Sequence, residues 1–229
     1  MKKLVKAILP NKVLEYLRSS KQQFRHMRNG FPYREYTKQY KCIFIHIPKT
    51  AGTSILTCLM GDKIYREHAS YFDFQRIDTH RFDEYFKFCF VRNPYDRAVS
   101  SYEYLKKGGD KQGDLYFQQL FESKYPTFEK FILEYLDKDK IYEHTLFRPQ
   151  YLFIYNYKNE CQVDYVGKYE NIKSDFKIIC KKLGVSFDLP SKNRVKRNPY
   201  ENYYSNQLVK QKIENLYSKD FFLFKYSKI

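Results

Sequence analysis

Residues 42–54 combine an apolar run with a lysine, a glycine and several hydroxyl groups. The run is CIFIHIP (42–48), and KTAGTS (49–54) follows it. A buried strand that ends in a short glycine-containing turn and continues as a helix directs unpaired backbone N–H groups and the positive helix end to one point, where an anion binds. Gly52 permits a tight turn, the hydroxyl groups add donors, and Lys49 adds a full charge. These residues predict an anion-binding loop.

The order of residues in this loop differs from that of the ATPase loop, GxxxxGK[ST]. In that motif the lysine follows the glycines and the Ser or Thr binds magnesium, whereas Lys49 precedes Gly52. No acidic residue follows an apolar run in the pattern of a metal ligand. A phosphoryl group carries enough charge to need a metal clamp, and a sulfuryl group carries less. We therefore expect sulfuryl chemistry without a metal, with a magnesium-dependent kinase or ATPase as the alternative.

A second anion contact is predicted in FVRNPYDRAVSSY (90–102), where another apolar run ends. Asn93 is a typical helix N-cap, and the proline after it suits the first helical position. Ser100 lies two helical turns beyond this cap on the same face, where its hydroxyl can join Arg92 on one phosphate.

Salt bridges are the structural alternative for the arginines of this segment. Arg92 would then pair with an acidic residue instead of an anionic ligand. We expect Arg97 to pair with Asp96 or another acid, and we do not treat it as a ligand residue.

A group that accepts the proton of an attacking hydroxyl should have a pKa near neutrality. Among the five histidines, His68 follows residues 63–67, which we expect to form a strand. His68 would then emerge at the same sheet edge as Lys49. Glu67 is the alternative base. The remaining candidates before residue 100 are expected to be structural or solvated: His26, His46 and His80.

These groups need a scaffold that brings several chain segments to one sheet edge. Strands are expected at residues 42–48, 85–92 and 163–168. Helices are expected at residues 54–60, from 94 onward, and at 127–136, 172–183 and 205–218, with Gly61 and Gly184 ending two of them. Strand–loop–helix units in series predict an α/β domain in which helices cover a parallel sheet.

Length and composition indicate one such domain. The 229 residues are 43% hydrophobic and include only 8 Gly and 8 Pro, which leaves little room for linkers. Five cysteines without a CxxC pair argue against zinc and against a disulfide framework, and they suit a reducing compartment. No apolar stretch is long enough to span a bilayer.

The positive charge gathers at the amino terminus. Residues 1–41 hold eleven Lys and Arg against two Glu, which supplies +9 of the net charge of +16. Asn11 can cap a helix with one apolar face formed by Val13, Leu14, Leu17 and Phe24. Such a basic amphipathic helix can lie on an anionic membrane, or it packs on the domain with its lysines in water. We therefore separate this segment from a domain at 42–229.

A strongly basic chain indicates anionic partners, and a nucleic-acid-binding protein is a second alternative. However, the sequence contains no RNP-like, helix-turn-helix or zinc-finger pattern, and the basic excess does not interleave with aromatic residues. We therefore expect no nucleic-acid partner.

The two anion-binding segments resemble the motifs with which the sulfotransferase superfamily binds 3′-phosphoadenosine 5′-phosphosulfate (PAPS). The form is that of the Golgi carbohydrate sulfotransferases and their bacterial relatives. IHIPKTAGTS resembles the 5′-phosphosulfate loop, and FVRNPYDRAVSSY resembles the 3′-phosphate motif. Similarity over about residues 42–226 continues in HASYFDF (68–74), RPQYLF (148–153), VDYVGKYENI (163–172) and YENYYSNQL (200–208).

The resemblance implies a three-layer α/β fold with PAPS as donor, adenosine 3′,5′-bisphosphate (PAP) as product, and no metal. It assigns the 5′-phosphosulfate to Lys49, Thr50, Ala51, Gly52, Thr53 and Ser54. It assigns the 3′-phosphate to Arg92 and Ser100. A loop that covers the nucleotide in the family corresponds to Asn193, Lys196 and Arg197.

The resemblance also implies the chemistry. His68 matches the catalytic histidine of the family and would take a proton from a hydroxyl of a glycan or glycolipid acceptor. The hydroxyl oxygen would attack sulfur in line, and Lys49 would neutralise the charge on the leaving nucleotide. The segment that contacts the acceptor in relatives contains His144, Arg148 and Gln150. Without the membrane anchor of the Golgi enzymes, the chain is expected to be a cytoplasmic bacterial relative, peripheral at the inner face of the membrane if residues 1–41 bind lipid.

Deletion of residues 1–30 tests the membrane interpretation of the basic segment. The shortened protein should bind PAP normally but pellet less with anionic liposomes, most clearly at low salt, because the lost attraction is electrostatic. Sedimentation of both proteins with neutral and anionic liposomes measures the difference. If the full-length protein ignores anionic liposomes, the segment instead packs on the domain.

Overall fold

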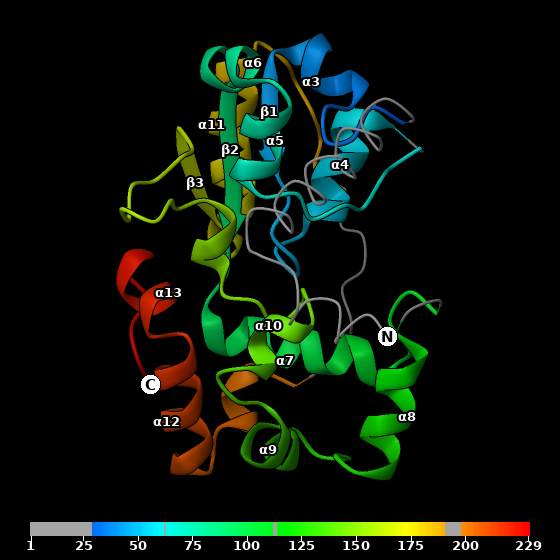
Figure 1. Cartoon of the computed structure of the whole chain (residues 1–229), viewed down its shortest axis with the longest axis vertical. Helices are drawn as coiled ribbons and strands as arrows, with labels where there is room; N and C mark the ends of the chain where they lie inside the picture. Colours follow the sequence, from blue (N-terminus) through cyan, green and yellow to red (C-terminus); the bar gives the residue numbers. More distant parts are fainter. Residues whose placement is uncertain (1–28, 62, 112–113, 191–197) are drawn as a thin grey trace, which may run out of the picture.

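A computed structural model describes residues 29–61, 63–111, 114–190 and 198–229 (Figure 1). Its sheet contains β1 (Cys42–Ile45), β2 (Phe86–Val91) and β3 (Tyr165–Lys168), in the order β1-β2-β3. Both pairings are parallel, with Cys42 opposite Phe86 and Phe88 opposite Tyr165. The predicted α/β fold, a parallel sheet flanked by helices, is confirmed.

Both faces of the sheet are buried, as near-continuous apolar strands require. Because side chains alternate along a strand, Cys42 and Phe44 face one cluster, and Ile43 and Ile45 face the other. The first face is covered by α3 (Glu35–Tyr40), α4 (Gly52–Met60) and α11 (Ile172–Leu183). The second face packs against α5 (Tyr71–Ile77) and α6 (Thr79–Glu84), and against the end of α13 (Ser218–Leu223). Helices on both faces give the three layers that the resemblance implies.

A second group of helices lies beyond the carboxyl ends of the strands (Figure 1). Its members are α7 (Pro94–Lys106), α8 (Leu115–Ser123), α9 (Phe128–Lys130) with a π-helical turn (Phe131–Tyr135), α10 (Lys140–Glu143) and α12 (Gln207–Leu216). Short 3-10 turns complete the described chain at Gln150–Phe153, Tyr169–Asn171 and Tyr200–Tyr203. The buried face of α7 joins Tyr95, Val99 and Tyr102 to an aromatic core with Phe131 and Tyr204. The carboxyl edge of the sheet, where both anion-binding segments begin, therefore faces this helical group.

Most of the expected elements are present. Asn93 caps α7 by accepting a hydrogen bond from the N–H of Tyr95, and Gly184 ends α11 with φ of 67°. The strand expected at residues 63–67 is wrong, because these residues form neither strand nor helix. The helix expected at 205–218 is present as α12, and α13 follows it. No helix in the described part of the chain has the length and apolar character needed to cross a membrane. Residues 1–28, where the amphipathic helix is expected, lie outside the described residues. The same is true of the nucleotide-loop candidates Asn193, Lys196 and Arg197.

Arg97 fastens α7 to the segment that precedes Gln150. Its side chain is 2% exposed, and its guanidinium donates to the carbonyl oxygens of Leu146 at 3.0 Å and Arg148 at 2.7 Å. Of the acids expected as partners of Arg97, Asp96 pairs with Arg92 instead, and Arg97 interacts electrostatically with the buried Asp220. Arg97 is thus a structural residue that fixes the main chain of 146–148.

Replacement of Arg97 with Met should destabilise the fold. The carbonyl oxygen of Arg148 would lose its described donor, whereas that of Leu146 would keep the Ser101 hydroxyl at 3.0 Å. An unsatisfied buried group costs about 1–3 kcal/mol, so the free energy of unfolding should fall by about 1–3 kcal/mol. Urea unfolding followed by circular dichroism measures this change. The control is Lys107→Met, which removes an exposed positive charge just after the same helix; equal stability of the two variants would contradict the assignment.

Candidate active site

The loop after β1 adopts the strand–turn–helix form that its sequence predicts. Lys49 and Ala51 have φ of 68° and 65°, a left-handed conformation that costs a residue with a side chain about 1–2 kcal/mol. The turn is held from inside, because the buried Thr50 hydroxyl donates to the carbonyl oxygen of Ile47 at 2.8 Å. Ala51 is the N-cap of α4, so the N–H groups of the first helical turn face the loop. Strained residues of this kind cluster at ligand sites.

Position 52 requires a glycine because the His46 ring lies against it, and not because of its own φ angle. The two left-handed residues supply the tight turn that the sequence analysis attributed to Gly52. A Cβ atom at Gly52 would lie 1.9 Å from Cδ2 and 2.0 Å from Nε2 of His46. His46 is buried, and this burial holds its pKa well below the usual 6.5. The neighbouring His68 makes a smaller contribution in the same direction. The neutral imidazole of His46 therefore packs directly on the start of α4.

His68 lies against His46 in a defined orientation. The two ring centroids are 4.3 Å apart, and Nδ1 of His68 is 2.9 Å from the carbonyl oxygen of His46. Since a carbonyl oxygen only accepts, Nδ1 carries the proton, and in the neutral ring Nε2 keeps its lone pair. Burial lowers the pKa of His68 from its usual 6.5, and the His46 carbonyl acts in the opposite direction. Near neutral pH, His68 therefore offers an unprotonated Nε2 that can accept a proton.

Several predicted site residues gather around His68. Electrostatic interactions with Lys49, His144 and Arg148 each help to lower its pKa. These residues come from separate segments of the chain. The fold therefore brings together residues that were predicted separately from the sequence. Tyr104 belongs to the same region, because Nζ of Lys49 lies 3.9 Å from the centroid of its ring. Tyr104 was not predicted from the sequence, although its position four residues after Ser100 on α7 puts both on one helix face.

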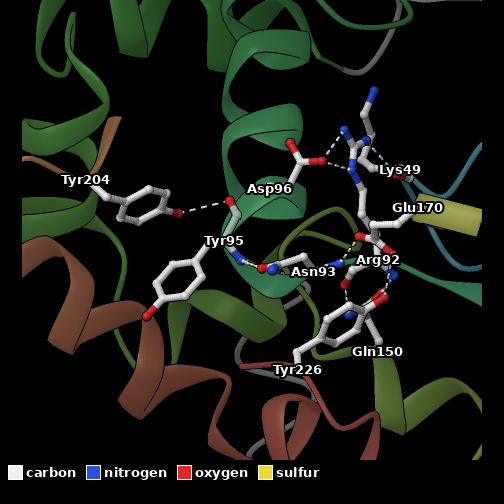
Figure 2. A network of polar contacts seen from close by, with 9 residues as sticks. All are labelled: Lys49, Arg92, Asn93, Tyr95, Asp96, Gln150, Glu170, Tyr204 and Tyr226. Atoms are coloured by element: carbon white, nitrogen blue, oxygen red, sulfur yellow. Dashed lines mark hydrogen bonds and ion pairs between the residues drawn. The ribbon is translucent and has the colours of Figure 1, made fainter. Parts of the chain in front are cut away.

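Arg92 is fixed through its main chain and its guanidinium (Figure 2). The amide of Gln150 accepts from the N–H of Arg92 at 2.9 Å and donates to its carbonyl oxygen at 2.8 Å. Nε of the guanidinium donates to Asp96 at 2.8 Å, and Nη1 donates to the carbonyl oxygen of Lys49 at 3.0 Å. The Tyr169 ring covers the guanidinium, with its centroid 4.0 Å from Cζ. Arg92 thus connects the two predicted anion-binding segments.

The salt bridge to Asp96 does not use all of the guanidinium. The bonds to Asp96 and Lys49 engage three of its five N–H donors. Ser100 is half-buried and lies one turn beyond Asp96 on the same face of α7. Arg92 therefore does form a salt bridge, with Asp96, which was the structural alternative to ligand binding. This salt bridge directs the guanidinium toward the helix face that carries Ser100.

The three candidate acceptor residues occupy different settings. Gln150 is fully buried, and both ends of its amide bind the main chain of Arg92, which makes it a positioning residue for Arg92. Nε2 of His144 is 3.2 Å from Asp114, and Nδ1 accepts from the N–H of Leu146, so both ring nitrogens have protein partners. Arg148 is half-buried. Contact of these three residues with an acceptor stays a prediction, for which Arg148 has the most suitable setting.

Residues 35–227 match the model of a family described as the sulfotransferase family. An uncharacterized protein of Archaeoglobus fulgidus is 35% identical over 115 residues, covering 50% of this chain and 80% of its own. Carbohydrate sulfotransferase 11 of Rattus norvegicus is 26% identical over 173 residues, which are 65% of this chain and 49% of the rat protein. Carbohydrate sulfotransferase 12 of Xenopus laevis is 25% identical, over 63% of this chain and 41% of its own. The chain spans about half the length or less of these named sulfotransferases, and no solved structure matches it.

Replacement of Arg92 with Ala tests the 3′-phosphate assignment. One lost charge-assisted hydrogen bond is worth roughly 1.5–3 kcal/mol, so PAP should bind about tenfold to a hundredfold more weakly in calorimetric titrations. Lys173→Ala, which removes an exposed charge from α11, controls for the change in net charge and should bind PAP normally. Wild-type affinity in Arg92→Ala, or equal affinity of the wild type for AMP and PAP, would refute the assignment.

Proposed function

This chain belongs to the sulfotransferase family, and from its site geometry we propose that it transfers a sulfuryl group from PAPS to a hydroxyl of a carbohydrate or glycoconjugate. One observation carries the proposal: the carbonyl oxygen of His46 fixes the proton of His68 on Nδ1, so that Nε2 is available as a base near Lys49. The names of the rat and frog relatives motivate the carbohydrate acceptor. The kinase, ATPase and nucleic-acid-binding alternatives are not needed to explain any of these features.

On the donor side, the loop 49–54 would hold the 5′-phosphosulfate with the N–H groups at the start of α4, its hydroxyl groups and the ammonium of Lys49. Arg92 and Ser100 would hold the 3′-phosphate. Because Arg92 donates to the carbonyl oxygen of Lys49, the two ends of the nucleotide would be bound by elements at a fixed spacing. A fixed spacing favours one orientation of the reactive sulfur.

In the reaction, Nε2 of His68 accepts the proton of the acceptor hydroxyl while its oxygen forms a bond to sulfur. The bond between sulfur and the bridging phosphate oxygen breaks on the opposite side, and PAP leaves with the electron pair. Lys49 neutralises the charge on that oxygen. In the structure its ammonium lies over the Tyr104 ring, a contact worth about 0.5–2 kcal/mol that a doubly charged phosphosulfate can replace.

Glu67 is a weaker candidate for the base. Its carboxylate forms an ion pair with Arg34, whose side chain is buried. A carboxylate held by a cation is a poorer proton acceptor than a neutral imidazole whose free nitrogen is unprotonated. The geometry therefore favours His68 over the alternative that the sequence left open.

We place this reaction in the cytoplasm, with a glycan or glycolipid acceptor that reaches the enzyme at the inner membrane face if residues 1–41 bind anionic lipid. The composition of the basic segment supports this arrangement. Transfer of ³⁵S from labelled PAPS into a panel of glycans is the direct test of the activity and of the acceptor class.

His68→Ala should separate chemistry from binding. It should bind PAP as the wild type does but lose about 10²–10⁴ in kcat, the usual contribution of a positioned base. Because the base must be neutral, wild-type kcat/KM should rise with pH through a pKa below the usual 6.5 of histidine, and this rise should be absent from the variant. His80→Ala is the matched control, since His80 is 80% exposed. Near-normal turnover of His68→Ala would place the base elsewhere and make Glu67→Gln the next variant.

Lys49→Ala should damage both binding and rate. Loss of a preorganised charge lowers kcat by about 10²–10³, and PAPS should bind more weakly because Lys49 contacts the donor. Titration with PAP and single-turnover ³⁵S transfer measure the two effects separately. A variant with normal rate and normal affinity would remove Lys49 from the mechanism.

A further inference from the structure

A buried arginine outside the family match contacts the segment that carries His68. Arg34 is 8% exposed and immediately precedes residues 35–227. Its guanidinium forms an ion pair with Glu67 and donates to the carbonyl oxygen of Asn29. Its Cζ also lies 4.1 Å from the centroid of the Tyr65 ring. Arg34 thus contacts residues one and three positions before His68.

That segment depends on side-chain contacts for its position. Residues 63–70 join α4 to α5 as a coil without helix or strand (Figure 1), so no ladder of backbone hydrogen bonds fixes their path. The carbonyl oxygen of His46 holds His68 at 2.9 Å, and at the end of the coil the N–H of Ser70 donates to Asp73 at 2.7 Å. Arg34 contacts the coil before His68, at Tyr65 and Glu67, and its own main chain is anchored as the N-cap of α3.

A small cavity with a mostly apolar lining lies against Arg34 and His46. It has a volume of about 20 Å³, and its lining includes Arg34, His46 and Glu67. A cavity of this size holds one water molecule if polar groups surround it. Two buried atoms of the lining residues, Nε of Arg34 and Nδ1 of His46, have no hydrogen-bond partner among the described protein atoms. A buried polar atom left in this way costs about 1–3 kcal/mol.

The chemistry of these two atoms is complementary to one water molecule. Nε of Arg34 can only donate, and a neutral His46 can accept at Nδ1. A water can accept from the arginine and donate to the histidine, and its second hydrogen can reach the Glu67 carboxylate that lines the same cavity. Such a water would satisfy both buried atoms and join Arg34 to the imidazole that supports His68.

We propose that Arg34 is a positioning residue for His68, which it holds through Glu67, Tyr65 and one buried water shared with His46. The role of His68 as base rests on the proposed function, but the positioning itself is a property of the protein without ligands. Arg34 touches neither the donor loop nor Arg92 in the contacts described above. Its loss should therefore alter His68 and leave nucleotide binding intact.

The charges around His68 fix the direction of the effect. The carbonyl oxygen of His46 binds it, Lys49, His144 and Arg148 interact with it electrostatically, and burial is the main reason that its pKa is low. Without Arg34, the coil would loosen and expose the ring, and the carboxylate of Glu67, next to His68 in the chain, would lose its ion pair with Arg34. Both changes favour the protonated imidazole, so the pKa of His68 should rise and the pH profile of activity should move to higher pH.

The experiment compares the full-length wild type with Arg34→Met, Arg34→Lys and the control Lys38→Met, which removes an exposed cation from α3. Long-range ¹H–¹⁵N NMR spectra of the histidine rings report tautomer and pKa without ligands and without activity. Wild type and control should show His68 protonated at Nδ1. Arg34→Met should show mixed tautomers, a raised pKa, kcat lower by about tenfold to a hundredfold, and PAP affinity within about twofold of wild type.

Unchanged tautomer and pKa of His68 in folded Arg34→Met would overturn the proposal. If that variant does not fold, Arg34→Lys decides: it keeps a charge for Glu67 but lacks the Nε donor, so mixed tautomers support the proposal and a wild-type spectrum refutes it. Failure of the proposed function is distinguishable, because sulfuryl transfer would then be absent from every variant while the spectra still depended on Arg34. A crystal structure of the wild type should show a water within hydrogen-bond distance of Arg34 Nε and His46 Nδ1, and a direct contact between these atoms would refute the water.

Discussion

The hydrogen bonds of Arg92 are the constraint on which the donor side of the site depends. One side chain joins the end of β2 to the anion-binding loop through the carbonyl oxygen of Lys49, and to α7 through Asp96. Its main chain is clamped by Gln150, whose own N–H donates to the buried carboxylate of Asp220 at 2.8 Å. Segments far apart in the sequence are thus brought to one sheet edge with little freedom to move separately. That rigidity would suit the proposed role of holding both ends of a nucleotide.

Local sequence signals predicted the elements well because their causes are local. The asparagine cap and following proline define the start of α7, and the left-handed Gly184 ends α11. The strand prediction for residues 63–67 failed because distant contacts determine their conformation. Tyr65 and Glu67 contact Arg34, which lies about thirty residues earlier in the chain. Contacts of this range leave no period or cap in the sequence.

The site shows the same division between local and distant causes. The loop and His68 could be found from motif and resemblance, whereas the tautomer of His68 depends on the His46 carbonyl across a separation of 22 residues. Gln150 was assigned to the acceptor because its segment resembles one that contacts the acceptor in relatives. Its burial against Arg92 depends on how the 3-10 turn packs under β2, which composition does not reveal.

One chain of contacts links the donor loop to the base. Gly52 begins α4 and leaves no room for a side chain against the His46 ring, and His46 in turn touches His68 by its ring and holds it by its carbonyl oxygen. A donor bound at the first turn of α4 would therefore press on the same helix end that supports His46. Because a close-packed interior transmits small displacements, we expect a ligand bound in the loop to affect the orientation of Nε2 of His68. The site is better regarded as one packed unit than as a nucleotide pocket with a separate catalytic residue.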